Sequence, residues 1–233
     1  MNLSQYLTKE HFYLNFIVDD RYMFFVNGLK VTLTVTLFAV LLGIVIGFLV
    51  GTIRSTCDKT GKLKVLDMIA RVYLSIIRGT PVVVQLMIMY YVIFSSPDAS
   101  KVMTAILSFA INSGAYVAEI FRSGIMSIDN GQFEAGRSLG FNYAQTIWYI
   151  ILPQAFKNAL PPLCNEFIAL LKETSVVGFI ALQDLTRAGD LVRSRTYNPV
   201  LPLITVALIY WVIVTILTKL VGILERRLRK SER

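Results

Sequence analysis

The chain has 233 residues, of which 55% are hydrophobic and 16% are charged, and its mean hydropathy is +0.61. A soluble globular chain carries about a quarter charged residues, whereas here the apolar residues gather in blocks of about 20. This composition excludes most soluble enzymes, disordered proteins and disulfide-built scaffolds, and it indicates a membrane protein with several spans.

The charge balance is basic, with 23 Lys and Arg against 15 Asp and Glu, a formal net charge of +8. In a membrane protein such an excess marks cytoplasmic loops rather than nucleic-acid binding, and no basic stripe is interleaved with aromatic residues. Cys57 and Cys164 lack metal-type spacing and His11 is the single histidine, so we expect no metal site. The first twenty residues lack an apolar stretch, so we expect no cleaved signal peptide.

Five segments are apolar over about 20 residues, the length that a helix needs to cross a bilayer. Helices are expected because unpaired backbone groups are costly in lipid and the segments lack the alternation of barrel strands. The predicted spans are residues 26–53, 72–94, 102–121, 147–182 and 196–218. The sequence therefore predicts an all-α polytopic membrane protein, with one membrane domain over residues 25–224.

The ends of the chain are more polar than the spans. Residues 1–24 mix aromatic with charged side chains and are expected to form an extracytoplasmic, interfacial segment, and residues 225–233 form a basic tail. More Lys and Arg fall on the side of the C-terminus than on the other side, which predicts an external N-terminus and a cytoplasmic C-terminus. Arg187, Arg193 and Arg195 argue the other way.

The loop between the third and fourth spans carries two helix-start signals. Asp129 precedes Gln132 by three residues, and Asn142 precedes Gln145 by three, so that each glutamine can reach back to an N-cap side chain. Gly140 lies between them, where a glycine closes a helix. We predict a short helix at about residues 130–139, a glycine corner, and a second helix that enters the membrane. Because so short a helix is marginal by itself, something must pack on it.

One spaced pattern runs through this loop. Glu134, Ala135 and Gly136 are followed by Gly140 and, nine residues later, by the stretch from Ile150 to Pro153. The pattern resembles the coupling motif E-A-A-x3-G-x9-I-x-L-P of ATP-binding-cassette (ABC) importer permeases. Gly136 replaces the usual alanine and Ile147 stands where phenylalanine is frequent, and both keep the position small or apolar.

Three further stretches resemble the polar-amino-acid branch of that family: R-G-T-P at 78–81, A-Y-V-A-E-I-F-R-S-G-I at 115–125 and N-E-F-I-A-L-L-K-E-T-S at 165–175. The resemblance covers residues 25–225 and implies a type I importer transmembrane domain with five spans, in a bacterial inner membrane. It implies a permease, not an enzyme, whose partners are an ATPase, a second permease subunit, an extracytoplasmic binding protein and the bilayer.

No phosphate-binding G-x-x-x-x-G-K run is present. ATP and Mg²⁺ are therefore expected in the partner ATPase, and no cofactor is expected in this chain. The substrate would be a polar amino acid, although the sequence does not say which.

The resemblance assigns the short helix to the contact with the ATPase. Ala135 and Gly136 lack bulk, so the backbone can come close to a partner, and Glu134 lies near the helix N-terminus, where a carboxylate is favoured. The predicted interface comprises Phe133, Glu134, Ala135, Gly136, Leu139 and Gly140. The alternative is an ordinary amphipathic loop helix that packs on its own chain.

Ionisable residues inside spans are costly and usually face the protein interior or a wet cavity. Pro161 and Pro162 are expected to break the fourth helix and free carbonyls beside Asn165 and Glu166. The predicted substrate pathway comprises Asn112, Tyr116, Asn165 and Glu166; a structural role for Glu166 is the alternative.

Glu119 is expected to pair with Arg122 or Ser123 one turn on. The residues assigned to gating or packing are Arg78, Pro81, Glu119, Lys172, Glu173, Thr174 and Ser175.

Other functions remain open from the sequence. A permease for another small polar solute, such as an opine or a compatible solute, fits the same pattern. An ion-coupled secondary transporter would use Glu119 and Glu166 as proton carriers, and a non-transporting assembly subunit would need no polar cavity. Gly43, Gly47 and Gly51, spaced by four, allow close helix contact, either within the chain or between subunits.

Overall fold

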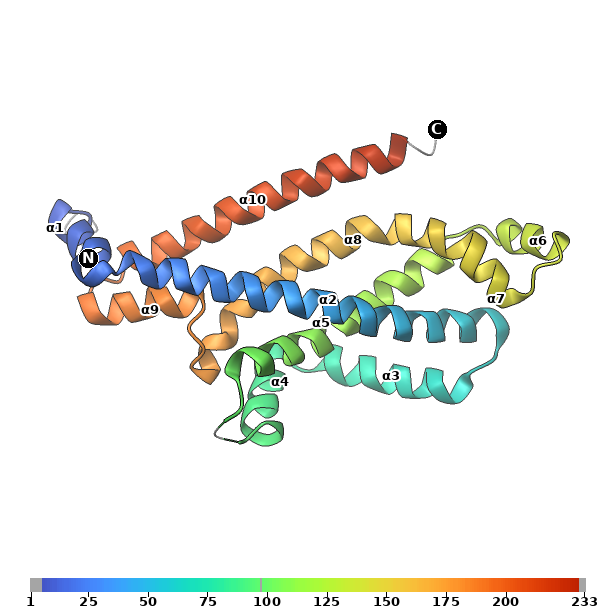
Figure 1. The fold of residues 1–233 in the computed structure, drawn as a ribbon, viewed down its shortest axis with the longest axis horizontal. Coiled ribbons are helices and arrows are strands. Elements are labelled where there is room, and N and C mark those ends of the chain that lie inside the picture. The colour runs from blue at the N-terminus through green and yellow to red at the C-terminus, as the bar shows by residue number, and fades with distance from the viewer. Residues whose placement is uncertain (1–5, 97, 231–233) are drawn as a thin grey trace. The chain divides into compact units, whose positions relative to one another are not determined.

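A computed structural model describes residues 6–96 and 98–230, and every regular element in those ranges is helical, as predicted (Figure 1). Two compact units are present. The first comprises the residues up to 39 with 82–109 and 168–219, and the second comprises 40–81, 110–167 and the residues from 220.

The first predicted span is part of a longer helix, α2 (Tyr22–Thr60), which contributes residues to both units. Residues 31–53 of the predicted span carry no charge and form the middle of this helix. The helix ends at Gly61, whose φ of +68° suits a residue without a Cβ. The Gly61 N–H donates to the Cys57 carbonyl at 2.8 Å, which satisfies a carbonyl of the last turn.

The second predicted span, residues 72–94, is not one continuous helix. The structure has α3 (Lys64–Gly79), then α4 (Val82–Ile88) with a π-helical continuation (Met89–Ile93). Thr80 between α3 and α4 is extended, with φ −125° and ψ 147°, because the ring of Pro81 disfavours a helical conformation in the residue before it. The average hydropathy of the window conceals this break.

The third predicted span lies within one continuous helix, α5 (Lys101–Met126). The fourth predicted segment divides into α7 (Tyr143–Thr146) before it, a π-helix (Ile147–Ile151), α8 (Leu152–Glu173) and a 3₁₀ stretch (Thr174–Ile180). The fifth predicted span starts too early: α9 (Leu185–Thr196) ends where that span was expected to begin, and α10 covers Leu201–Lys230.

Three of the described helices are long and apolar enough to cross a membrane, namely α2, α5 and α10. A fourth crossing is counted if α3 and the helix beyond Pro81 form one broken span. The proline-containing α8 is not among them, since it carries Lys157, Glu166 and Lys172 along its length. The count of five spans therefore stays a prediction.

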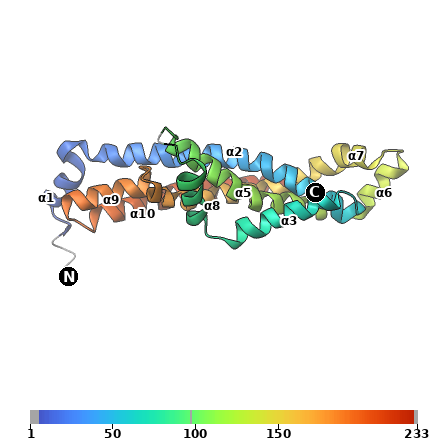
Figure 2. The same cartoon turned by 90° about the horizontal axis from the view of Figure 1, so that it is seen from below.

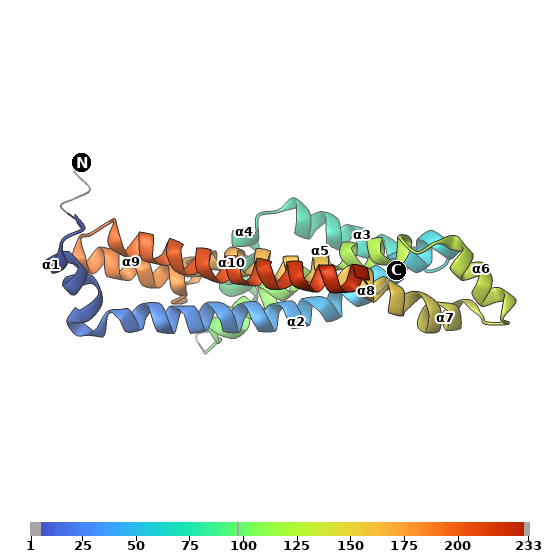
Figure 3. The same cartoon turned by 90° about the horizontal axis from the view of Figure 1, so that it is seen from above.

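In the first unit, the polar N-terminal segment packs on α9 (Figure 3). It comprises α1 (Lys9–Phe12), a π-helix (Tyr13–Ile17) and a 3₁₀ turn (Val18–Asp20). Asn15 is fully buried and accepts a hydrogen bond from the Thr196 hydroxyl at 2.8 Å. Residues 1–5 of the predicted N-terminal segment, and residues 231–233 of the predicted tail, lie outside the described residues.

An apolar core holds α2, α9 and α10 together in the same unit, with Phe25, Leu185, Val192 and Val206 at its centre. The contacts are close: a Cβ on Gly28 would lie 2.6 Å from the Asp184 carbonyl oxygen. The Thr32 hydroxyl accepts the Leu185 N–H at 3.2 Å, which satisfies a donor at the start of α9.

In the second unit, the glycine stripe of α2 packs against α5. A Cβ on Gly47 would lie 2.4 Å from Val117 Cγ1, and one on Gly51 would lie 2.7 Å from the Ala118 carbonyl oxygen. A Cβ on Gly43 would lie 3.2 Å from Ser113 Cβ. The stripe therefore serves a contact within the chain, which decides between the two roles left open by the sequence.

We expect Gly47→Ala to lower the free energy of unfolding by about 1–3 kcal/mol, because the added methyl overlaps Val117 and the backbone beside it. Gly222→Ala on α10 is the matched control, since nothing lies within 4 Å of a Cβ there, and it should be neutral or stabilising by about 0.5–1 kcal/mol. Thermal unfolding of the detergent-solubilised protein measures both. Equal unfolding temperatures for the two variants would contradict the close α2–α5 contact.

Candidate coupling and translocation site

The predicted coupling helix is α6 (Asn130–Ser138) in the second unit, with Asp129 as its N-cap. The Asp129 carboxylate accepts the Gly131 N–H at 2.7 Å. The Gln132 side chain was expected to reach back to the N-cap residue Asp129. Its side-chain oxygen instead accepts a hydrogen bond from the Gln154 amide at 3.4 Å. The helix start was predicted correctly, and one half of its cap was not.

The corner after α6 follows from the predicted glycine. Gly140 has φ +80°; its N–H donates to the Arg137 carbonyl at 2.9 Å, and the Phe141 N–H donates to the Gly136 carbonyl at 3.0 Å. This pair of bonds is the Schellman closure, which needs a left-handed residue after the helix. A residue with a Cβ would be strained there.

The second predicted N-cap is confirmed in both directions. The Asn142 side chain accepts the Gln145 N–H at 2.9 Å, and the Gln145 side chain accepts the Asn142 N–H at 2.9 Å. The π-helix of residues 147–151 follows and ends two residues before Pro153, whose ring crowds the preceding turn. Burial raises the pKa of Tyr143 in the first turn of α7.

The six residues of the predicted interface divide between two faces. Glu134, Ala135 and Leu139 are exposed, Leu139 to 70%. Gly136 is instead buried, because a Cβ on it would lie 2.6 Å from Thr146 Cγ2 of α7. Phe133 is half-buried and stacks on Tyr143 with the ring centroids 6.4 Å apart.

The role expected for Gly136 therefore needs correction. Its small size lets α6 approach α7 of the same chain, as Figure 2 shows for the corner between these two helices. The exposed positions, rather than Gly136 and Phe133, remain for an external partner.

The break expected at Pro161 and Pro162 does not occur, since α8 is continuous through both prolines. A proline removes the hydrogen bond to the carbonyl four residues before it, so the affected carbonyls are at positions 157 and 158. The proposed freeing of carbonyls beside Asn165 and Glu166 is therefore wrong.

Glu166 nevertheless faces α5. The Ser113 hydroxyl donates to its carboxylate at 2.9 Å, and Asn112, the neighbour of Ser113, is almost fully buried. Asn165 is exposed. Tyr116 is partly exposed and lies under the Arg78 guanidinium, 5.5 Å from ring centroid to guanidinium carbon.

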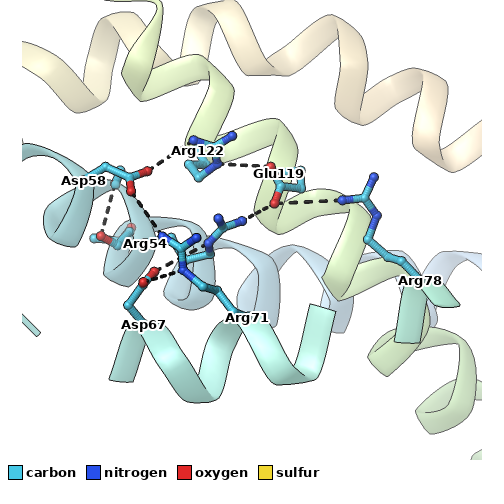
Figure 4. A network of polar contacts seen from close by, with 9 residues as sticks. Arg54, Asp58, Asp67, Arg71, Arg78, Glu119 and Arg122 are labelled. Carbon is cyan, nitrogen blue, oxygen red and sulfur yellow. Dashed lines mark hydrogen bonds and ion pairs between the residues drawn. The ribbon is translucent and has the colours of Figure 1, made fainter. Parts of the chain in front are cut away.

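A cluster of ion pairs joins α2, α3 and α5 in the second unit (Figure 4). Glu119 pairs with Arg54 of α2 and with Arg122 at 3.1 Å, and Arg78 lies 3.9 Å from it. The expected partner Arg122 is thus confirmed, with two further guanidinium groups that the sequence did not suggest.

Two aspartates complete the cluster. Asp67 of α3 pairs with Arg71 at 2.7 Å and with Arg54 at 3.6 Å. Asp58 of α2 pairs with Arg122 at 3.2 Å and with Arg71 at 3.6 Å. An open hollow of about 400 Å³ lies beside the cluster, with Arg54, Arg71, Arg78 and Glu119 among its walls.

The sequence offered one overlooked signal for this cluster. Arg54 with Asp58, and Asp67 with Arg71, are opposite charges four residues apart, a spacing that places them on one helix face. All four residues fall outside the predicted spans, whereas α2 and α3 extend beyond those spans.

The remaining gating candidates lie at the end of α8. Thr174 is buried and its hydroxyl lies 3.5 Å from that of Thr36 on α2, in the first unit. Lys172 and Glu173 are exposed. Ser175 lines a separate hollow of about 460 Å³ with Arg187, Asp190 and Arg193 of α9.

The arginines of α9 surround Asp190 in that hollow. Hydrogen bonding from Arg193 at 2.6 Å lowers the pKa of Asp190, and Arg187 at 2.7 Å acts in the same direction. These charges, which argued against the predicted orientation, are partly neutralised by their own helix.

We expect Gly136→Ala to destabilise the protein by about 1–3 kcal/mol, because the new methyl overlaps the branched side chain of Thr146. Thr146→Ala in the same chain should restore most of the loss, since it removes both of the atoms that lie within 3 Å. Thermal unfolding of the two single variants and the double variant measures this coupling. Additive losses would contradict the contact.

We expect Glu119→Gln to cost about 1–3 kcal/mol, because it leaves the guanidinium of Arg54, which is 11% exposed, with Asp67 as its remaining carboxylate. Asp190→Asn is the matched control, because its carboxylate is likewise shared between arginines, two in this case, but is 36% exposed. That change should cost about 1 kcal/mol or less. The prediction fails if the unfolding temperature falls more in the control.

Comparisons with known proteins agree with the resemblance to importer permeases. Residues 39–230 match the family described as binding-protein-dependent transport system inner membrane component. The putative glutamine transport system permease protein GlnP of Rickettsia typhi is 40% identical over 172 residues, 73% of this chain and 79% of the relative. The arginine transport system permease protein ArtQ of Bacillus subtilis is 40% identical over 185 residues, 77% and 83% of the two chains.

A solved structure, an amino acid ABC transporter with histidines, is 40% identical with a TM-score of 0.80, over 88% of this chain and 94% of that chain. The residues matched by the family model, 39–230, include α6 and the helices around it. The chain therefore belongs to the family of inner membrane components of binding-protein-dependent transport systems, as a translocation subunit whose ATP is hydrolysed by a separate ATPase.

Proposed function

We propose that this chain carries a polar amino acid into the cytoplasm, as the permease subunit of an ATP-driven importer. It receives the amino acid from an extracytoplasmic binding protein and is driven by an ATPase that contacts the loop of residues 129–153. Relatives named for glutamine and arginine transport, and a solved structure described as an amino acid transporter, support the substrate class.

In this proposal the binding protein determines which amino acid is carried. Two relatives with the same 40% identity are named for different amino acids, one neutral and one cationic. We therefore place most of the selectivity outside this chain. Asn112, Tyr116, Asn165 and Glu166 form the proposed path, with the Glu166 carboxylate as the acceptor for the ammonium of the substrate.

The assembly would contain two permease subunits, either two copies of this chain or this chain and a relative. The N-terminus would be external and the C-terminus cytoplasmic, and the span count would be five. The charge distribution of the loops supports this orientation.

The observation that carries the proposal is the exposed face of α6. Leu139 is 70% exposed at the end of a capped helix, beside the exposed Glu134 and Ala135. An exposed leucine at a rigid corner, with a small residue beside it, suits insertion into a groove on a partner. The carboxylate of Glu134 suits a basic residue on that partner.

We expect Leu139→Asp to reduce ATP-driven uptake at least tenfold, because the loss of an apolar anchor and its replacement by a charge cost about 2 kcal/mol or more at an interface. Leu139→Met, which keeps the apolar contact, is the matched control. The measurement is uptake by proteoliposomes that contain this chain, the ATPase and the binding protein, together with co-purification of the ATPase. Uptake unchanged by the aspartate would contradict the assigned interface.

The same vesicles separate the alternative functions. Uptake driven by an ion gradient without ATP would favour a secondary transporter. ATP-driven uptake of an opine or a compatible solute, with no amino acid carried, would favour the related importer class. Neither outcome is expected.

A further inference from the structure

Lys59, near the end of α2, contacts the predicted coupling helix at two points. Its ammonium donates to the Asn130 side-chain oxygen at 2.6 Å, and it lies 4.7 Å from the centroid of the Phe133 ring. Asn130 is the first residue of α6 and Phe133 lies in its first turn. A hydrogen bond and a cation–π contact from one side chain therefore fix the start of α6 against α2.

The Phe133 ring is held on a second side as well. It stacks on Tyr143 of α7 with an interplanar angle of 18°. The ring therefore contacts both a cation of α2 and an aromatic ring of α7. This explains why Phe133 is half-buried although α6 is otherwise largely exposed.

The residue before Lys59 belongs to the ion-pair cluster. Asp58 pairs with Arg122 of α5 at 3.2 Å and with Arg71 of α3 at 3.6 Å. Consecutive residues of α2 thus connect α6 on one side with α3 and α5 on the other. All of these residues lie in the second unit.

The contact with Lys59 differs from the other attachment of α6. At its far end α6 is closed by the backbone hydrogen bonds around Gly140 and packs on Thr146 of α7 through Gly136. Lys59 restrains the opposite end, where the helix begins. A displacement of α6 then has to move α2 or break the contact.

We propose that Lys59 is a positioning residue for transport, which ties α6 to α2 so that a displacement of the coupling helix reaches the ion-pair cluster of α2, α3 and α5. This inference rests on the proposed function, because it requires α6 to be the part that the ATPase moves. It assigns to the last turn of α2 a role that lies outside the sequence pattern of the coupling motif.

The experiment replaces Lys59 with Met, which keeps the length of the side chain and removes its charge. Reconstituted importer should carry about fivefold less amino acid per ATP hydrolysed, the effect of losing a contact of about 1 kcal/mol, while ATP hydrolysis continues. Lys59→Arg keeps both contacts and should restore the ratio. Lys62→Met is the matched control, since Lys62 is an exposed lysine of the same segment.

Further variants keep the outcome decisive. Asn130→Ala removes the acceptor alone and should lower the same ratio, and adding it to Lys59→Met should bring little further loss. If Lys59→Met lowers the unfolding temperature markedly, Asn130→Ala decides the matter.

A transport-to-ATP ratio for Lys59→Met and Asn130→Ala equal to that of Lys62→Met would overturn the inference. Failure of the proposed function itself would give a different result: the Leu139→Asp variant would take up the amino acid at the wild-type rate.

Discussion

The ion pairs around Glu119 are the interaction on which the second unit depends. Arg54 is 11% exposed and comes from a helix that is apolar over most of its length, and an unpaired guanidinium in such a place costs several kcal/mol, on the order of 3–5. Because the carboxylates that neutralise it stand on α3 and α5, the three helices have one arrangement in which the charges are satisfied.

The close packing of glycines of α2 on α5 is compatible with these ion pairs. Between helices in lipid, apolar surface gives little driving force, so contact depends on backbone approach. Gly47 and Gly51 bring α2 against Val117 and Ala118 of α5, which directly precede Glu119. The glycine stripe thus sets the separation at which the arginine of α2 reaches the glutamate of α5.

Features with local causes could be predicted from the sequence, and features with distant causes could not. The two N-caps and Gly140 were predictable because a cap depends on three or four neighbouring residues. The helix α9 was missed despite similar signals, an Asp184 cap and apolar Leu185 and Val192 on one face, because its arginines suggested a loop. Apart from the Glu119–Arg122 pair, the ion-pair cluster was missed because its pairs join different helices, and the spacing of residues within one helix does not determine such pairs.

The corner of the coupling loop shows how a motif divides between two tasks. Its glutamate and first small residue are exposed, whereas Gly136 is buried against Thr146 of α7. The spacing from Gly136 to Gly140 is that of a Schellman closure, in which the residue after the glycine bonds back to the third residue from the helix end. The small residue and the later glycine therefore fold the corner, and the positions between and beside them are left for a partner. A substitution that harms transport at Gly136 acts through this fold, while one at Leu139 acts through the surface.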